Sequence, residues 1–325
     1  MRRITTLFIL IVAIAGGGFF FSKYKIEGLE NVVFRPRDSD SGSKLSAGEP
    51  REKNTVRIAS FNIQAFGTSK AGKPQVMSML ANVVRQFDVV AIQEVRSKDQ
   101  TLVPNFVRQI NANGAKYEFV LGPPLGRTVS KEQYAFIFNS ETVEVDRNSV
   151  YTLSDPHDRM HREPLVAMFR TRGPPSNEAF TFKLVNVHTD PDDVPEEMNA
   201  LADVYRAVVN DGDGEDDVIL LGDFNTSEKT LYQVAHISPT IATALADIMT
   251  NTRGTKAYDN LIFDGRHTSE FLGRSGVLDL VRVFNSTTEE ILQVSDHLPV
   301  WGDFTVFENR GAERLATSPA GKPIR

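Results

Sequence analysis

Apolar positions in the middle of the chain follow two kinds of spacing. From residue 74 to 87 they recur every three or four residues, which places them on one face of a helix, and Pro74 suits its first turn. A second helix is expected at about 196–210. Alternating or continuous apolar runs instead predict strands at 56–63, 88–95, 133–139, 142–151, 164–170, 180–188, 217–222, 257–263 and 299–307.

The order of these elements indicates an α/β fold. Strands alternate with helices early in the chain and follow one another as hairpins later, which is typical of mixed β-sheets with helices packed on them. We therefore expect one catalytic domain over residues 55–308. A segment of this length can bury a core that folds without covalent cross-links.

The two ends of the chain differ from this central part. Arg2 and Arg3 precede a run without charge from position 4 to 21, which predicts a signal peptide or membrane anchor over residues 1–21. Residues 22–54 are predicted to be a disordered linker and 309–325 a disordered tail, because apolar anchors are few. We expect an exported protein, either membrane-anchored and facing outside or secreted or periplasmic, whose N-terminal segment engages a membrane or the export machinery.

Composition narrows the chemistry. The 325 residues include no cysteine, which excludes disulfides, thiolate metal sites and cysteine nucleophiles. The net charge of −6 argues against a protein that coats nucleic acid through bulk electrostatics, but it is compatible with an enzyme that touches a few phosphates. The acidic run at 211–217 is interpreted as a solvated turn before a strand.

Several predicted strands end in, or are preceded by, polar residues that a hydrophobic core would not select. In α/β sheets, such residues gather at the strand ends that line a ligand site. Their joint occurrence predicts one polar site for a hard cation and general acid–base groups. The residues are Asn62, Gln93, Glu94, His188, Asp223, Asn225, Asp296 and His297.

These residue types suit phosphodiester hydrolysis. Mg²⁺ or Mn²⁺ prefers oxygen ligands, so Glu94 with Asn62 or Asp296 would hold such an ion better than a histidine cluster. Histidine near neutral pH exchanges a proton with water or a leaving alkoxide, and a carboxylate behind it fixes its tautomer.

Each residue taken singly also has a structural interpretation. Glu94 could form a salt bridge with a neighbouring arginine, and His188 could be a core histidine. Asp223 and Asn225 could form an Asx turn. Such coincidences at so many strand ends would have to occur together, which favours the site.

The residues occur in blocks whose order and spacing resemble the endonuclease/exonuclease/phosphatase superfamily, and most closely deoxyribonuclease I. The resemblance covers about residues 56–307. It implies a four-layer α/β sandwich of two packed mixed β-sheets flanked by helices. The blocks are Ser60-Phe61-Asn62-Ile63, Ile92-Gln93-Glu94-Val95-Arg96, Lys131-Glu132-Gln133-Tyr134, Arg162-Glu163-Pro164, Val187-His188, Gly222-Asp223-Phe224-Asn225, Ala257-Tyr258-Asp259 and Ser295-Asp296-His297-Leu298-Pro299-Val300.

The resemblance also implies roles for these residues. Glu94 is similar to the family's principal metal ligand, with Asn62 and Asp296 nearby. Two catalytic pairs are implied, His188 with Glu132 and His297 with Asp259, and we favour His188 as acid and His297 as base. The remaining implied residues orient or bind the substrate: Asp223, Asn225, the phosphate-binding Arg162, the minor-groove Arg96, and Tyr258.

The sequence departs from the deoxyribonuclease pattern in places that bear on DNA contact. Gln64 stands where that pattern has an arginine, and Ser130 stands where it has a tyrosine. A preference for double or single strands therefore stays open.

A loop after the fourth predicted strand resembles a structural calcium site. It carries Asp155 and Asp158, with Glu163 close by, and a solvated acidic loop is the alternative. His157 and His161 in this loop are interpreted as surface residues.

Three functions follow. The first is a divalent-metal-dependent phosphodiesterase, an exported deoxyribonuclease I-like endonuclease that is monomeric and hydrolyses DNA. The second keeps the chemistry and changes the substrate, as in a sphingomyelinase-like or other phosphoesterase. The third is a catalytically dead surface module that binds nucleic acid or protein, against which the complete set of site residues argues.

Overall fold

Two β-sheets form the framework of the protein. The computed structural model describes residues 52–308 apart from 130, 228–230, 232–240 and 247. The first sheet contains β1 (Thr55–Phe66), β2 (Val89–Val95), β3 (Tyr117–Leu121), β4 (Gln133–Asn139), β11 (Phe271–Val277) and β12 (Val300–Thr305). Their order is β11-β12-β1-β2-β4-β3, with β1 parallel to β2 and the other neighbours antiparallel.

The second sheet is also mixed. Its order is β5-β6-β7-β8-β10-β9, with β7 parallel to β8 and the other neighbours antiparallel. The ends of β1 and β2, and those of β7 and β8, therefore meet in parallel pairs. The strands are β5 (Val143–Thr152), β6 (Leu165–Thr171), β7 (Thr181–His188), β8 (Val218–Asp223), β9 (Ile241–Thr243) and β10 (Asp259–Asp264).

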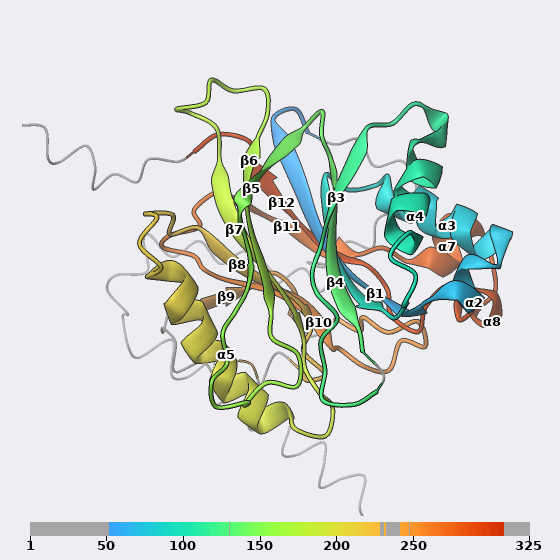
Figure 1. Ribbon diagram of the computed structural model, residues 1–325. Helices are drawn as coiled ribbons and strands as arrows, with labels where there is room; N and C mark the ends of the chain where they lie inside the picture. Colours follow the sequence, from blue (N-terminus) through green and yellow to red (C-terminus); the bar gives the residue numbers. More distant parts are fainter. Residues whose placement is uncertain (1–51, 130, 228–230, 232–240, 247, 309–325) are drawn as a thin grey trace, which may run out of the picture. The chain divides into compact units, whose positions relative to one another are not determined.

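Helices cover the outer faces of both sheets (Figure 1). On the first sheet lie α3 (Pro74–Val84) and α4 (Leu102–Ile110), whose buried apolar residues join the main core. On the second lies α5 (Val194–Val209). Along β8 the side chains alternate, so that Leu221 packs between the sheets and Leu220 packs with α5. Shorter helices are α2 (Thr68–Ala71), α7 (Leu280–Phe284), α8 (Thr288–Ile291) and a 3₁₀ turn at Asn111–Asn113.

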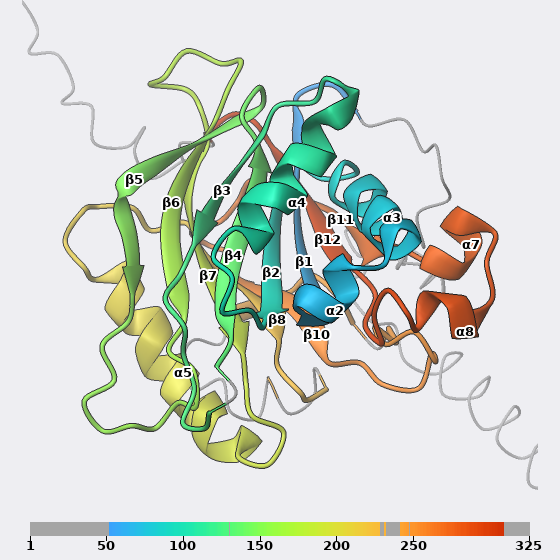
Figure 2. The same ribbon diagram turned by 45° about the vertical axis from the view of Figure 1, so that its right-hand side comes forward.

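Aromatic rings fill the space between the sheets. The ring centroids of Phe136 and Phe138 in β4 lie 5.5 Å and 5.6 Å from that of Phe169 in β6. Phe263 in β10 and Phe304 in β12 are 5.8 Å apart. These contacts join the sheets face to face, and the two views in Figures 1 and 2 show the resulting layers. The four-layer α/β sandwich implied by the resemblance is confirmed.

Most predicted elements are present, with shifted ends. The helix predicted at 74–87 ends at Val84, and the one predicted at 196–210 begins at Val194. The strand predicted at 56–63 continues to Phe66. The pattern did not predict α4, β3, β9, β11 or the shorter helices.

The acidic run before β8 is a solvated turn only in part, because Asp211, Asp213 and Asp216 are exposed while Glu215 and Asp217 are buried. Glu215 is 8% exposed and Asp217 is 2% exposed. Asp211 and Asp213 each lie 2.7 Å from Nζ of Lys183, which is itself buried. Burial of this run depends on Lys183 and on neighbouring segments that its local composition does not reveal.

The predicted N-terminal segment at 1–21, the linker up to residue 51, the tail at 309–325 and Ser130 lie outside the described residues. Among the helices that the structure does describe, none has the length and apolar character needed to cross a membrane.

Candidate active site

The register of β7, β8 and β10 places three polar side chains in a row. His188 lies opposite Asp223 in the parallel pair, and Asp259 lies opposite the same Asp223 in the antiparallel pair. Side chains at paired positions lie on the same face of a sheet. Gly222 allows the close approach of β7, since a Cβ there would lie 1.9 Å from the carbonyl oxygen of Val187.

His188 and His297 are held in the same way. Nδ1 of His188 lies 2.8 Å from Oε1 of Glu132, and Nδ1 of His297 lies 2.9 Å from Oδ2 of Asp259. Because each Nδ1 faces a carboxylate, Nε2 is the nitrogen left for a reacting group. The two Nε2 atoms lie 3.6 Å and 3.4 Å from Oδ2 of Asp223. Both imidazoles therefore face one carboxylate.

Burial and neighbouring charges act in opposite directions on these groups. Burial lowers the pKa of His297, but Asp259 and Asp223 outweigh it and raise that pKa to about 10. Burial also lowers the pKa of His188, but its hydrogen bond to Glu132 and that residue's charge outweigh it, so the pKa is raised. Burial would raise the pKa of Glu132, yet His188 is foremost among the groups that lower it to about 2. The chain's own groups thus favour imidazolium–carboxylate pairs.

Glu94 is turned toward the site by an irregularity in β2. Its pairing with β4 shifts register between Ile92 and Val95, and Glu94 has a φ of 61°. Such a backbone conformation costs about 1–3 kcal/mol and persists only where its surroundings hold it, most often at functional sites. Here the N–H of Ala65 donates to Oε2 of Glu94 at 2.7 Å, and Nδ2 of Asn62 donates to Oε1 at 3.1 Å.

Asn62 connects the two sheets at this point. Its Nδ2 also donates to Oδ2 of Asp223 at 3.1 Å. Oγ of Ser295 donates to the carbonyl oxygen of Asn62 at 2.7 Å and accepts the N–H of His297 at 3.0 Å. The Glu94 carboxylate and the histidine pairs therefore belong to one cluster, built from strand ends of both sheets.

Several buried oxygen atoms could hold a cation here. Asp223, Asp259 and His297 each offer one ligand atom within 4.8 Å of the others. Oδ1 of Asp259 is buried without a hydrogen-bond partner among the described residues. Oδ1 of Asp296 lies 4.0 Å from Nε2 of His297. Carboxylates with one imidazole fit a hard divalent cation.

This group is not the ligand set predicted from the sequence, which was Glu94, Asn62 and Asp296. The two sets are adjacent, because Asn62 donates to both Glu94 and Asp223. Oδ2 of Asp259 is already engaged by His297 and by Oγ1 of Thr250. Asn62 therefore joins the Glu94 carboxylate to the group that contains Asp223.

Asn225 sits in the turn after β8. Its N–H donates to Oδ1 of Asp223 at 2.9 Å, which is the Asx turn considered as an alternative. Its Nδ2 donates to the carbonyl oxygen of Thr189 at 2.8 Å. The turn and the site coexist, since Oδ2 of Asp223 still faces the histidines.

The predicted substrate-binding residues differ in exposure. The side chain of Arg96 is 38% exposed and lies 3.3 Å from Glu94 and from Glu132. Arg162 is buried, and its Nε lies 2.6 Å from Oε1 of Glu132. Tyr258 is half-buried, with its ring 6.4 Å from that of His297. All three residues lie beside the cluster, and Arg96 is the more solvent-exposed of the two arginines.

The sequence did not point to several residues that support the site. Nζ of Lys70 donates to the carbonyl oxygens of Ile63, Gln64 and Val294. Burial lowers the pKa of Lys70 to about 8, against the opposing charges of Glu94 and Asp296. Three further residues hydrogen-bond a predicted site residue: Thr250, which lies outside the blocks that resemble the superfamily, and Tyr134 and Ser295, which lie in those blocks without an assigned role.

The predicted calcium loop shows other partners. Oδ2 of Asp155 accepts the N–H of Met160, and Asp158 lies 3.1 Å from Arg127. In the described ranges, Asp155, Asp158 and Glu163 are not one of the groups of three close enough to share an ion. His157 is exposed, as predicted, whereas His161 is half-buried, with its side chain 16% exposed and its Nδ1 3.0 Å from Asp190.

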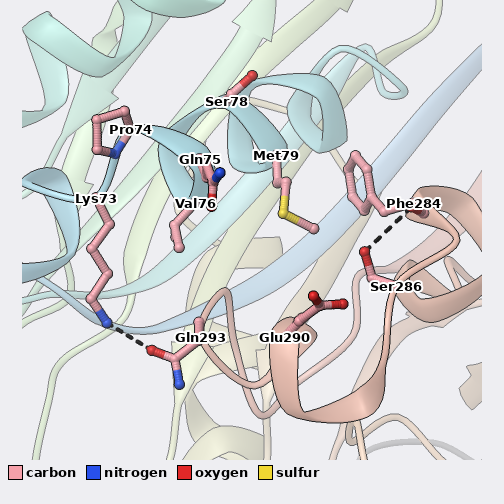
Figure 3. A pocket seen from close by; sticks show the side chains of 10 residues that line it. All are labelled: Lys73, Pro74, Gln75, Val76, Ser78, Met79, Phe284, Ser286, Glu290 and Gln293. Carbon is pink, nitrogen blue, oxygen red and sulfur yellow. Dashed lines mark hydrogen bonds between the residues drawn. The ribbon is translucent and has the colours of Figure 1, made fainter.

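A cavity of about 860 Å³ lies elsewhere, between α3 and the α7–α8 segment. Figure 3 shows Lys73 and Gln293 joined beside it by a hydrogen bond of 2.8 Å. None of the predicted site residues lines this cavity. The cluster of titratable groups with shifted pKa values, rather than cavity size, therefore marks the candidate site.

Comparison with known proteins agrees with this geometry. A sequence profile described as the Endonuclease/Exonuclease/phosphatase family matches residues 59–297. Deoxyribonuclease-1-like 2 of Mus musculus is 33% identical over 258 residues, which cover 75% of this chain and 90% of that protein. Deoxyribonuclease-1 of Gallus gallus is 32% identical over 261 residues, covering 76% and 91%.

Solved structures share the fold at low sequence identity. The catalytic domain of human Nocturnin superposes with a TM-score of 0.54 at 16% identity, covering 78% of this chain and 94% of that one. An endonuclease/exonuclease/phosphatase from Bacteroides vulgatus gives 0.54 at 15% identity, covering 78% and 100%.

The chain belongs to the endonuclease/exonuclease/phosphatase family. Within that family it is deoxyribonuclease I-like. At this level of description it is a metal-dependent phosphodiesterase of the nuclease kind.

Proposed function

We propose that this protein is an exported endonuclease that hydrolyses DNA with a bound divalent cation. The observation that carries the proposal is the pair of imidazoles whose Nε2 atoms lie 3.6 Å and 3.4 Å from Oδ2 of Asp223. Hydrolysis of a phosphodiester needs one group to take a proton from water and another to give one to the leaving oxygen. Two carboxylate-backed histidines that face one point meet this need.

His188 and His297 move protons at Nε2. Glu132 and Asp259 hold the proton on each Nδ1 and stabilise the imidazolium form. The neighbouring carboxylates raise both pKa values, which favours the acid role, whereas a divalent cation bound beside Asp223 would lower the pKa of a nearby imidazole and so favour the base role. We keep His188 as the acid and His297 as the base, and the pH dependence of variants tests this order.

Glu94 and Asn62, with Asp296 and Asp223 beside them, would hold the divalent cation, Mg²⁺ or Mn²⁺. When bound, such a cation supplies positive charge that stabilises the negative charge developing on the phosphate. Glu94 is fixed for this task by the N–H of Ala65 and by Asn62. Asn225 and Asp223 orient the phosphate and the attacking water.

DNA is the proposed substrate because the relatives named deoxyribonucleases align with nine-tenths of their own length. Arg96, exposed beside Glu94, is placed to contact the substrate, and Tyr258 lies beside His297. Arg162 is buried against Glu132, so we propose that it binds phosphate while holding that carboxylate.

Export, a structural calcium ion and a monomeric state complete the proposal. Export is supported by Arg2, Arg3 and the uncharged run at 4–21, which fit either a cleaved signal or a membrane anchor. The calcium ion would be held by Asp155 and Asp158 in the loop and by Glu163 after it, and Asp158 would exchange its present pairing with Arg127 for the ion.

The test is nicking of supercoiled plasmid by the purified full-length chain with Mg²⁺, Mn²⁺ or chelator. His297→Ala and Glu94→Ala are expected to lower the rate by at least ~10²-fold, the usual effect of removing a general acid–base group or a metal ligand. His267→Ala is the matched control, since His267 also pairs with an aspartate, Asp216 at 2.9 Å, but outside the cluster. Its rate should match that of the wild type.

Nicking that survives both His297→Ala and Glu94→Ala would overturn the proposal. Sphingomyelin vesicles are assayed in parallel with plasmid. Release of phosphocholine without nicking would move the substrate to a phospholipid and keep the chemistry. DNA retention without turnover under every divalent cation would identify a binding module.

A further inference from the structure

Carboxylates from three segments meet at the end of β8 that lies away from Asp223. Asp217 directly precedes β8, Glu270 directly precedes β11, and Glu308 follows β12. Each offers one oxygen within 4.8 Å of the others. Asp217 and Glu270 are 2% and 1% exposed, and Glu308 is half-buried. We call these three residues the distal carboxylate cluster.

Two buried oxygen atoms at the cluster lack a hydrogen bond of normal length and angle within the described residues. They are Oδ1 of Asp217 and Oγ1 of Thr268. Thr268 is 1% exposed, and its hydroxyl lies close enough to Asp217 to lower the pKa of that carboxyl. A buried oxygen atom without a partner is costly, and a cation would satisfy both the carboxylate and the hydroxyl oxygen.

The surrounding charges add to the cost of this arrangement. Burial and the neighbouring carboxylates, Glu270 first among them, raise the pKa of Asp217 to about 9. Lys183 does not relieve the repulsion, because its ammonium group is bound by Asp211 and Asp213. Like charges this close and this buried are usually balanced by a proton or by a metal ion.

We propose that Asp217, Glu270 and Glu308, with Thr268 as a further oxygen ligand, bind a Ca²⁺ ion. Calcium accepts six to eight oxygen ligands in irregular geometry, whereas Mg²⁺ demands an octahedron and retains several waters, which a buried cluster does not provide. Asp223 follows Asp217 by six positions along the chain, so this ion lies about 20 Å from the active site at the usual rise per residue of a strand.

The ion would join the two sheets. Asp217 flanks a strand of the second sheet, while Glu270 and Glu308 flank strands of the first. Around it the backbone already links the sheets, since the N–H of Phe180 donates to the carbonyl oxygen of Val306 at 2.9 Å. The ion therefore acts on stability, independently of the proposed hydrolysis of DNA.

The experiment is thermal unfolding of the full-length chain in chelator, in millimolar Ca²⁺ and in millimolar Mg²⁺, with bound Ca²⁺ counted by equilibrium dialysis. Ca²⁺ is expected to raise the wild-type Tm by at least about 4 °C. In the double variant Asp217→Asn, Glu270→Gln, Ca²⁺ should no longer raise the Tm, and the protein should bind one Ca²⁺ ion fewer. In chelator its Tm should exceed that of the wild type, because the repulsion is removed.

Glu141→Gln, which removes an exposed carboxylate, is the matched control and should keep the Ca²⁺ response. If the double variant does not fold, Glu308→Gln at the half-buried member should weaken Ca²⁺ binding at least ~10-fold. The proposal is overturned by a wild type that ignores Ca²⁺, by variants that keep its response, or by an equal response to Mg²⁺. None of these measurements depends on DNA cleavage, so their outcome is independent of the test of the proposed nuclease activity.

Discussion

Asp259 and His297 form a buried pair in which Oδ2 of Asp259 lies 2.9 Å from Nδ1 of His297. Oγ1 of Thr250 donates to the same Oδ2 at 2.7 Å, so the carboxylate is held from two directions. Its orientation sets that of the imidazole, and its charge raises the pKa of His297 against the effect of burial. The pair therefore controls both where the proton sits and at which pH it is lost.

Asp259→Asn should lower kcat for plasmid nicking by at least ~10²-fold, since an amide does not stabilise the imidazolium. Removing the negative charge also makes protonation of His297 less favourable, so its pKa falls from about 10. The limb of the pH–kcat profile that reports His297 then moves to lower pH. Thr250→Val removes a neutral hydrogen bond and keeps the charge, so its limb should stay close to that of the wild type. Superimposable profiles for Asp259→Asn and wild type would remove His297 from the proton-transfer step.

In the sequence, His297 was marked by its place before a predicted strand, whereas Asp259 was named only through the resemblance to the superfamily. The residues that hold the site residues in place were harder to predict from the sequence. Lysine is exposed by default, and burial of Lys70 depends on the carbonyl oxygen of Val294, which is remote in sequence. Burial of Asp217 at the end of the acidic run was missed for the same reason, since Asp217 lies against Glu270 and Glu308, which are remote in sequence.

Secondary structure followed the apolar pattern except where particular residues obscured it. α4 contains Pro104, which reads as a helix breaker but sits in the first turn, where its missing N–H costs nothing. β11 contains Gly273 and Gly276, which lower strand propensity. β4 lacks such residues, and its predicted bounds of 133–139 are those observed.

Glu132→Gln should make the protein less stable near neutral pH and less sensitive to acid. The pKa of Glu132 is lowered from 4.5 to about 2, so its ionised form is favoured by folding. That stability, on the order of 3 kcal/mol, is fully present above about pH 4.5 and is lost as the pH falls toward 2. The Tm difference between variant and wild type should therefore shrink as the pH falls below about 5.

Glu118→Gln is the control for this measurement. Glu118 pairs with Arg147 at 2.8 Å, but both side chains are more than half exposed, and such pairs contribute little at any pH. A Tm difference for Glu132→Gln that stays constant from pH 7 to pH 3 would show that its charge does not stabilise the fold.

Lys70→Met should raise the concentration of divalent cation needed for half-maximal activity by about 10–100-fold, the usual effect of losing a group that orients a metal ligand. Lys70 holds the carbonyl oxygens of Ile63 and Gln64, in the bulge that directs Ala65 toward Glu94. Lys73→Met is the matched control, because Lys73 is exposed and its Nζ donates to Oε1 of Gln293 at 2.8 Å, away from the site. An unchanged cation requirement in Lys70→Met would mean that the bulge is rigid without it.

Gly222→Ala should destabilise the fold by more than ~3 kcal/mol, which marks a steric conflict that the backbone cannot avoid. The added Cβ would lie 1.9 Å from the carbonyl oxygen of Val187, in the parallel pair that sets His188 opposite Asp223. Relief requires β7 and β8 to move apart at the residues that carry the site, so activity should fall even in chains that stay folded. Gly72→Ala has only ordinary contacts at 3.5 Å and is the control. A Gly222→Ala protein with the Tm and nicking rate of the control would show that the spacing of these strands does not determine the geometry of the two histidines.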